Sequence, residues 1–82
     1  MKVGDFVVVT ADYAYGTDVS EKNKLGYIAS EDKDIDDGTM YEVLTNLYDN
    51  SGYYYTEDEL RLATDGEIIA EFRRLYESRH VL

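Results

Sequence analysis

The chain has 82 residues, of which 44% are hydrophobic, and it contains no cysteine. This length allows one domain with a single small core, and the lack of cysteine excludes disulfides, thiolate metal sites and thiol nucleophiles. Eighteen acidic residues against eight basic ones give a formal net charge of −10, a field that repels nucleic-acid phosphates and attracts basic surfaces.

The charge is unevenly distributed along the chain. Residues 64–82 have a net charge of −1, so the remaining −9 belongs to residues 1–63. The first residues, Met1 to Asp5, lack the apolar run of a signal peptide, and no segment approaches membrane-spanning length. We therefore expect a cytoplasmic protein that contacts neither membrane nor nucleic acid directly, and whose partner is a protein with a basic surface.

The first half of the chain predicts two strands separated by a long polar segment. Residues 6–9 are all aromatic or β-branched, which is typical of a strand. If Val7 and Val9 face inward, Phe6 and Val8 face outward and need cover. Residues 11–24 are expected to form an irregular loop or an open hairpin. Residues 25–30 predict the second strand, in which Gly26 marks a bend or a close backbone approach.

Residues 31–63 predict a charged turn and three further strands. Residues 31–38 carry five acids and one lysine and are expected to form a turn. Residues 39–48 and 53–55 are β-prone runs joined by a turn at 49–52, which predicts a hairpin. A short fifth strand is expected at residues 61–63. The predicted core consists of Val7, Val9, Ile28, Tyr41, Val43, Leu60 and Leu62.

The last segment predicts an amphipathic helix over residues 64–79. Thr64 and Glu67 have the spacing of a capping box, and apolar residues recur at positions 68, 69, 72, 75 and 76 on one face. A lone helix of this length is marginal in water, so it must pack on something. We expect Ile69 and Phe72 to be buried against the outward side of the first strand, over Phe6 or Val8.

The pattern of these residues resembles a known group of folds. Val3-Gly4-Asp5 followed by Val7 and Val9, Gly26 with Ile28, Tyr41 with Val43, and a tyrosine-rich strand leading into Glu59-Leu60-Arg61-Leu62 are similar to the small SH3-like barrels. These include KOW-type and Tudor-like modules and many short proteins of bacteria and their phages. The resemblance covers residues 2–63 and implies a mainly β fold, a five-stranded SH3-like barrel, with the C-terminal helix added to it in a single domain of residues 1–82. Where KOW-type nucleic-acid binders have basic loops, this chain has acidic ones.

Two groups of residues are candidate partner-binding surfaces. The acidic turn offers Glu31, Asp32, Asp34, Asp36 and Asp37. A calcium loop starting at Asp32 would need glycine at its sixth position and glutamate at its twelfth, but Asp37 and Val43 stand there, so we expect no metal.

The second group consists of tyrosines, for which two interpretations stay open. One is that they form an aromatic surface that binds a peptide or a methylated ammonium group, using Tyr13, Tyr15, Tyr53, Tyr54 and Tyr55. The other is that alternate tyrosines of 53–55 simply pack the barrel.

No arrangement of residues predicts catalysis or a cofactor. The single histidine, His80, lies near the end of the chain, and neither a nucleophile motif nor a phosphate-binding glycine loop is present. The sequence therefore predicts a non-enzymatic, acidic protein-binding module, in its sharpest form an inhibitor that imitates nucleic-acid charge, as small phage and mobile-element inhibitors do. The alternatives are a reader that uses the tyrosine surface, a structural subunit that associates through its helix, and a barrel whose charge serves only solubility.

Overall fold

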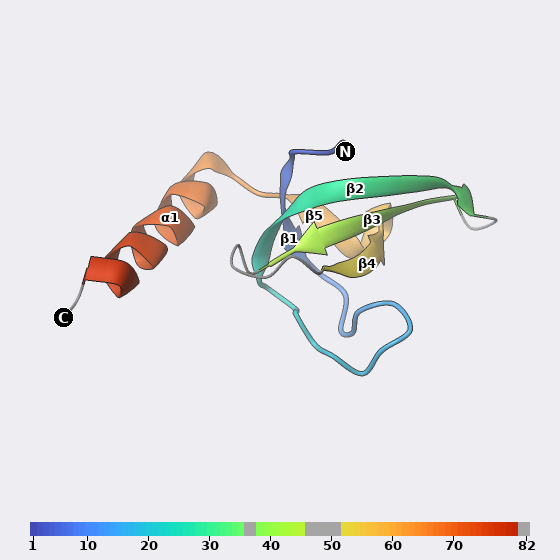
Figure 1. The fold of residues 1–82 in the computed structure, drawn as a ribbon, viewed down its shortest axis with the longest axis horizontal. Helices are drawn as coiled ribbons and strands as arrows, with labels where there is room; N and C mark the ends of the chain where they lie inside the picture. The colour runs from blue at the N-terminus through green and yellow to red at the C-terminus, as the bar shows by residue number, and fades with distance from the viewer. Residues whose placement is uncertain (36–37, 46–51, 81–82) are drawn as a thin grey trace.

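The computed structural model describes residues 1–35, 38–45 and 52–80, with backbone alone at 34–35 and 78–80. Its elements are β1 (Phe6–Val9), β2 (Leu25–Ile35), β3 (Gly38–Leu44), β4 (Tyr53–Thr56), the 3-10 turn η1 (Glu57–Glu59), β5 (Leu60–Leu62) and α1 (Asp65–His80). The fold is mainly β, as expected: one five-stranded antiparallel sheet and one C-terminal helix (Figure 1).

The strands lie in the order β4-β3-β2-β1-β5, and each neighbouring pair is antiparallel. β1 lies between β2 and β5, and of its four apolar residues the three valines are buried and Phe6 is half-buried. Val7 and Val9 are fully buried, and Val8 is 4% exposed although it points to the other side of the sheet. On that other side, Val8 lines a hollow together with Glu67 and Ala70 of α1.

The core lies inside the curved sheet. It consists of Val7, Val9, Ala14, Ile28, Tyr41, Val43, Tyr55 and Leu60. The prediction is confirmed for six of its seven residues but is wrong for Leu62, which is 57% exposed. Leu62 is the last residue of an edge strand, and the chain leaves the sheet directly after it, so no described element covers its side chain.

Gly26 makes the close backbone approach that its place in a strand predicts. A β-carbon at this position would lie 2.6 Å from the carbonyl oxygen of Leu44 and 2.8 Å from Cγ1 of Val43. Both distances are far below van der Waals contact, so no larger residue fits at position 26 without a shift of β3.

The segment from 31 to 38 is not the turn that its charge predicts. β2 continues through it to Ile35, and β3 begins at Gly38, so that Glu31 pairs with Tyr41 and Asp32 with Met40. Cross-strand pairing outweighs the low strand propensity of aspartate here. Two register shifts interrupt this hairpin, one between Ile28 and Ser30 and one between Asp32 and Ile35. Of the predicted third strand, residues 46–48 lie outside the described residues, as do positions 49–51 of the predicted hairpin turn.

The helix extends away from the sheet, and this is where the packing prediction fails. Figure 1 shows α1 at one end of a molecule whose long axis measures 48 Å, against 25 and 21 Å for the others. Phe72 meets Phe6 edge to face, with ring centroids 5.8 Å apart, but it is still 48% exposed. Ile69 is 58% exposed, so the prediction of its burial is wrong. Periodicity defines an apolar face but does not fix which part of that face meets the sheet.

Candidate protein-binding surfaces

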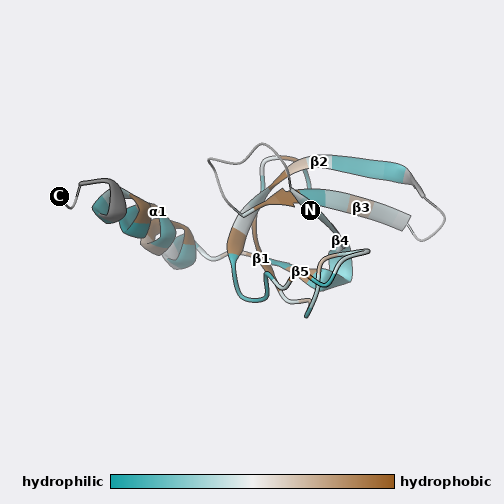
Figure 2. Ribbon diagram, turned by 60° about the horizontal axis from the view of Figure 1, so that its bottom comes forward, coloured by the Kyte–Doolittle hydropathy of each residue, from teal (hydrophilic) through white to brown (hydrophobic). Residues whose placement is uncertain are grey.

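Residues 31–42, within the hairpin of β2 and β3, are the most acidic part of the chain, and we call this segment the acidic arm. It carries six acidic residues and one lysine, a net charge of −5, which is half of the total. The end of β2 and the start of β3 lie at the opposite end of the molecule from α1 (Figure 1). In Figure 2 this part of β2 is the longest hydrophilic run of the sheet.

Acidic side chains occupy both sides of the arm. Glu31 and Asp32 are consecutive in β2, both are exposed, and period-two geometry turns them to opposite sides. Glu31 lies opposite Tyr41 and 3.5 Å from the ammonium group of Lys33. Asp32 shares its side with Glu42, which accepts a hydrogen bond from the Ser30 hydroxyl at 3.1 Å. Asp34 continues β2, while Asp36 and Asp37 lie outside the described residues.

Tyr41, which pairs with Glu31, lies near carboxylates of the arm and of two other segments. Burial is the main cause that raises the pKa of Tyr41, and the neighbouring carboxylates of Glu57, Glu31 and Asp5 raise it further. The Tyr41 hydroxyl donates a hydrogen bond to the carbonyl oxygen of Met1 at 3.4 Å. Carboxylates from three different segments therefore act together on the Glu31 side of the arm.

The structure divides the five candidate tyrosines between core and surface. Tyr55 is fully buried and Tyr53 is half-buried against the core, as the packing interpretation expects. Tyr13, Tyr15 and Tyr54 are 58%, 65% and 45% exposed. The backbones of two of these residues are joined, because the N–H of Tyr15 donates to the carbonyl oxygen of Tyr54 at 3.2 Å.

One exposed tyrosine, Tyr54, adjoins the Asp32 side of the arm. Tyr54 lies opposite Glu42 in the β3–β4 register, and Glu42 lies opposite Ser30 in the β2–β3 register. A row across three strands thus joins a hydroxyl, a carboxylate and a phenol ring. The sequence presents the acidic and aromatic groups as separate surfaces, whereas strand register makes them neighbours.

Sequence reasoning missed one buried charged residue, Glu21. It is 6% exposed, and its carboxylate accepts hydrogen bonds from the hydroxyl of Tyr55 at 2.9 Å and from the hydroxyl of Thr45. Burial, and then the hydrogen bond to Glu21, raise the pKa of Tyr55 above its ordinary value of 10.0. Nothing in a polar loop marks one glutamate as buried. Its partners identify Glu21 as the anchor that fastens the loop of residues 11–24 to β4 and the end of β3.

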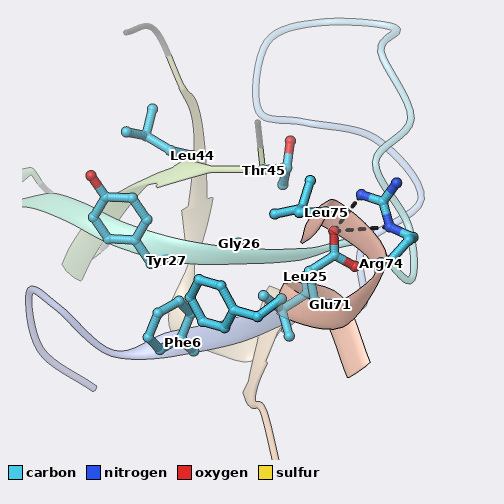
Figure 3. Close-up of a pocket in the computed structure, with 10 residues that line it drawn as sticks. Phe6, Leu25, Gly26, Tyr27, Leu44, Thr45, Glu71, Arg74 and Leu75 are labelled. Carbon is cyan, nitrogen blue, oxygen red and sulfur yellow. Dashed lines mark hydrogen bonds and ion pairs between the residues drawn. The ribbon is translucent and has the colours of Figure 1, made fainter. Parts of the chain in front are cut away.

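Of two hollows that the described residues form between the sheet and α1, the larger measures about 630 Å³ and is an open depression lined by Val8 and Glu67, and the smaller is more enclosed. The smaller hollow measures about 240 Å³ and is bordered by Phe6, Tyr27 and Leu44 on the sheet side and by Phe72, Leu75 and the Glu71–Arg74 ion pair on the helix side (Figure 3). Small-molecule sites usually measure about 300–1,000 Å³. We attribute this hollow to the incomplete packing of α1 on the sheet.

Comparisons of the chain with protein-family models, with curated proteins and with solved structures find no match. Within the part of the chain that the structure describes, no helix has the length and apolarity needed to cross a membrane. Among the same residues, no group of three or more His, Asp or Glu side chains has a geometry that could hold a metal ion.

Proposed function

We propose that this chain is a small, non-enzymatic protein-binding module whose acidic arm docks on a basic surface of another protein. The observation that carries the proposal is the two-sided display of Glu31 and Asp32 on a strand that continues through the acidic segment to Ile35. Charge of one sign steers partners of the opposite sign and gives specificity in association. A partner with a basic groove would contact both sides of the arm at once.

More specifically, we propose that the partner is a nucleic-acid-binding protein. A surface that binds nucleic acid is built to contact a series of negative charges. The arm presents such charges on both of its sides, Glu31 on one and Asp32 with Glu42 on the other. The module would then act as a competitor of nucleic acid, as phage and mobile-element inhibitors do.

The fold that presents the arm is, we propose, an SH3-like barrel. β4 and β5 are the two edge strands of the sheet, yet only the three residues of η1 separate them in the chain. A flat sheet of five strands would place its edges roughly 19 Å apart, at about 4.8 Å per strand spacing. A three-residue link spans only about 10–14 Å. This mismatch supports a sheet that rolls until its edges approach each other.

A second candidate function uses the exposed Tyr54, which lies opposite Glu42, and Tyr15, whose backbone is bonded to that of Tyr54. An exposed phenol ring near a carboxylate is suited to a cationic side chain of a peptide, held by cation–π and charge contacts. Binding of this kind depends on the rings and is less sensitive to salt than binding by the arm. Tyr54→Ala would abolish it, whereas binding by the arm alone would persist.

The test compares three baits in affinity capture from host-cell extract, at low and high salt, with mass-spectrometric readout. The first bait is the wild-type protein, and the second carries Glu31→Gln, Asp32→Asn and Glu42→Gln in the arm. The third bait, with Asp18→Asn, Asp65→Asn and Glu77→Gln, loses three exposed acids elsewhere, so that both variants have the same formal net charge of −7.

We expect a basic protein that is captured at low salt by the wild-type and control baits and lost from the arm variant. Equal capture by all three baits would contradict the proposal, because the arm would then not contribute to binding. Equal loss from the arm variant and the control would also contradict it, because net charge rather than the arm would then decide binding. A further bait with Tyr54→Ala tests the second candidate function: capture that is lost with this bait but kept by the arm variant would favour the tyrosine surface.

A further inference from the structure

One side of α1 carries an exposed apolar stripe. Ile69, Phe72 and Tyr76 stand at positions i, i+3 and i+7 of the helix, and they are 58%, 48% and 64% exposed. This spacing places them on one face. Large apolar side chains that form a continuous exposed strip usually mark an interaction site.

The protein's own sheet contacts a different side of the helix. Figure 3 shows Glu71, Arg74 and Leu75 of α1 around the hollow above β1 and β2, and the rings of Phe72 and Phe6 meet edge to face. At about 100° per residue, Ile69 lies well over 90° around the helix from both Glu71 and Arg74. The sheet therefore meets the helix along the edge of the stripe and leaves most of it uncovered.

The charges of the helix indicate what covers the stripe. The first eight residues, 65–72, contain three acids and no base, whereas the last eight, 73–80, contain three arginines and one glutamate. The two halves thus have net charges of −3 and +2. A second copy of the same helix in antiparallel orientation would place each acidic half beside a basic half, whereas a parallel copy would place acids beside acids.

We propose that two copies of this chain pair through an antiparallel contact of α1 with its counterpart, related by a two-fold axis near Phe72. The stripe is symmetric about this point, so Ile69 of each copy packs on Tyr76 of the other. Such a self-complementary patch is the form that two-fold dimers require.

The large negative charge of the chain does not oppose this arrangement. The helix has a net charge of −1, and the acidic arm lies at the other end of the 48 Å long axis. At physiological salt, charges are screened over about 8 Å, so the two arms of a dimer would be outside each other's field. The dimer would leave both arms free and would offer two docking sites to a multivalent basic partner.

The first test is the mass of the full chain in sedimentation experiments over a concentration series. We expect a rise from 9.4 kDa to twice that value in the wild-type protein. Ile69→Lys should hold the mass at that of a single chain. Glu77→Lys is the matched control: it adds the same side chain at an exposed helix position outside the stripe, and its mass should still double. Far-UV circular dichroism verifies that both variants keep the fold.

A wild-type protein that keeps the mass of one chain throughout the series would overturn the proposal and leave a different protein as the partner of the stripe. So would an Ile69→Lys variant whose mass still doubles, because the contact would then lie elsewhere.

Orientation is tested separately by single cysteines, since the chain has none of its own. Arg73→Cys lies beside the proposed axis and should form a disulfide-linked dimer on oxidation. Asp65→Cys lies at the helix end, far from its counterpart in an antiparallel pair, and should not. Efficient cross-linking of Asp65→Cys would contradict the antiparallel arrangement.

Discussion

Glu21 shows how a single side chain can organise a segment that lacks regular structure. The loop of residues 11–24 has few apolar residues, yet Ala14 is buried and Asn23 adopts a left-handed backbone with φ of 71°. The buried carboxylate of Glu21 joins this loop to Tyr55 and Thr45. A buried charge is tolerated only when its oxygens accept hydrogen bonds, and here each oxygen has one.

Removing the Tyr55 hydroxyl should therefore destabilise the fold. Tyr55→Phe keeps the ring in the core but deprives the Glu21 carboxylate of a donor. We expect a loss of about 1–3 kcal/mol in the free energy of unfolding, measured by urea titration at pH 7. Tyr54→Phe, at an exposed position of the same strand, is the control and should change the free energy little.

The same residue predicts how stability depends on alkaline pH. The pKa of Tyr55 is raised in the folded state by burial and by Glu21, whereas in the unfolded chain it is about 10. Above that pH the unfolded chain binds fewer protons than the folded one, so stability is full below pH 10 and falls as the pH rises further. The slope of unfolding free energy against pH should be shallower in Tyr55→Phe; equal slopes would show that Tyr55 titrates normally in the folded protein.

Two leucines of β5 offer a direct test of the core. Leu60 is 6% exposed and Leu62 is 57% exposed, although alternation alone would bury both. Leu60→Ala should cost about 2–5 kcal/mol in urea unfolding, because it leaves a cavity. Leu62→Ala should cost much less. A large loss for Leu62→Ala would mean that this side chain is buried in solution, against another copy or another part of the chain.

At the scale of elements, the sequence predicts the number and order of strands better than their lengths. Residues 6–9 are recognisable because every side chain favours a strand. The continuation of β2 through Glu31 to Ile35 is not recognisable from the sequence, because most of its residues are charged and do not favour a strand. This part of β2 is stabilised by pairing with β3, and a local sequence pattern does not show that pairing. For the same reason the acidic and tyrosine surfaces cannot be joined from sequence alone: their contact depends on register and on the loop hydrogen bond at Tyr15.

The start of α1 is the element boundary that the sequence predicts correctly. The hydroxyl of Thr64 accepts a hydrogen bond from the backbone N–H of Glu67, and the Glu67 carboxylate accepts one from the backbone N–H of Thr64. Arg61 adds two hydrogen bonds to the same carboxylate, both of 2.8 Å. The capping box is confirmed, and the additional partner in β5 ties the helix to the sheet.

The hydrogen bonds of Glu67 at the start of α1 should make the stability of the fold depend on acidic pH. The hydrogen bonds from Arg61, followed by that from the Thr64 backbone, lower the pKa of Glu67 from 4.5 to about 2. The folded chain then binds fewer protons than the unfolded one, so the contribution of Glu67 is full above pH 4.5 and is lost as the pH falls toward 2. The difference in urea midpoint between wild type and Glu67→Gln, followed by far-UV circular dichroism, should shrink over this range. Glu71→Gln, which removes only the contact with Arg74, should show a weaker pH dependence; equal behaviour would contradict the role of Arg61.

At the scale of the whole molecule, the chain separates two kinds of surface along its long axis. The acidic arm lies at one end, and the exposed stripe of α1 lies at the other (Figure 1). Composition predicts that an acidic surface exists, and periodicity predicts that the helix has an apolar face. Neither reveals that the two are at opposite ends, because that follows from the direction in which the chain leaves β5. The separation allows one end to serve association with a second copy and the other to bind a partner.

The central claim, that the acidic arm selects a basic partner, is tested most directly by the association rate with the captured protein as a function of salt. Stopped-flow measurements would compare the wild type, the arm variant (Glu31→Gln, Asp32→Asn, Glu42→Gln) and the control variant of equal net charge. We predict that the arm variant associates at least tenfold more slowly at low salt and that its rate depends less steeply on salt, while the control stays close to the wild type. Rates and salt slopes that are equal in the two variants would contradict the claim, because the arm would then contribute no more than its share of the net charge.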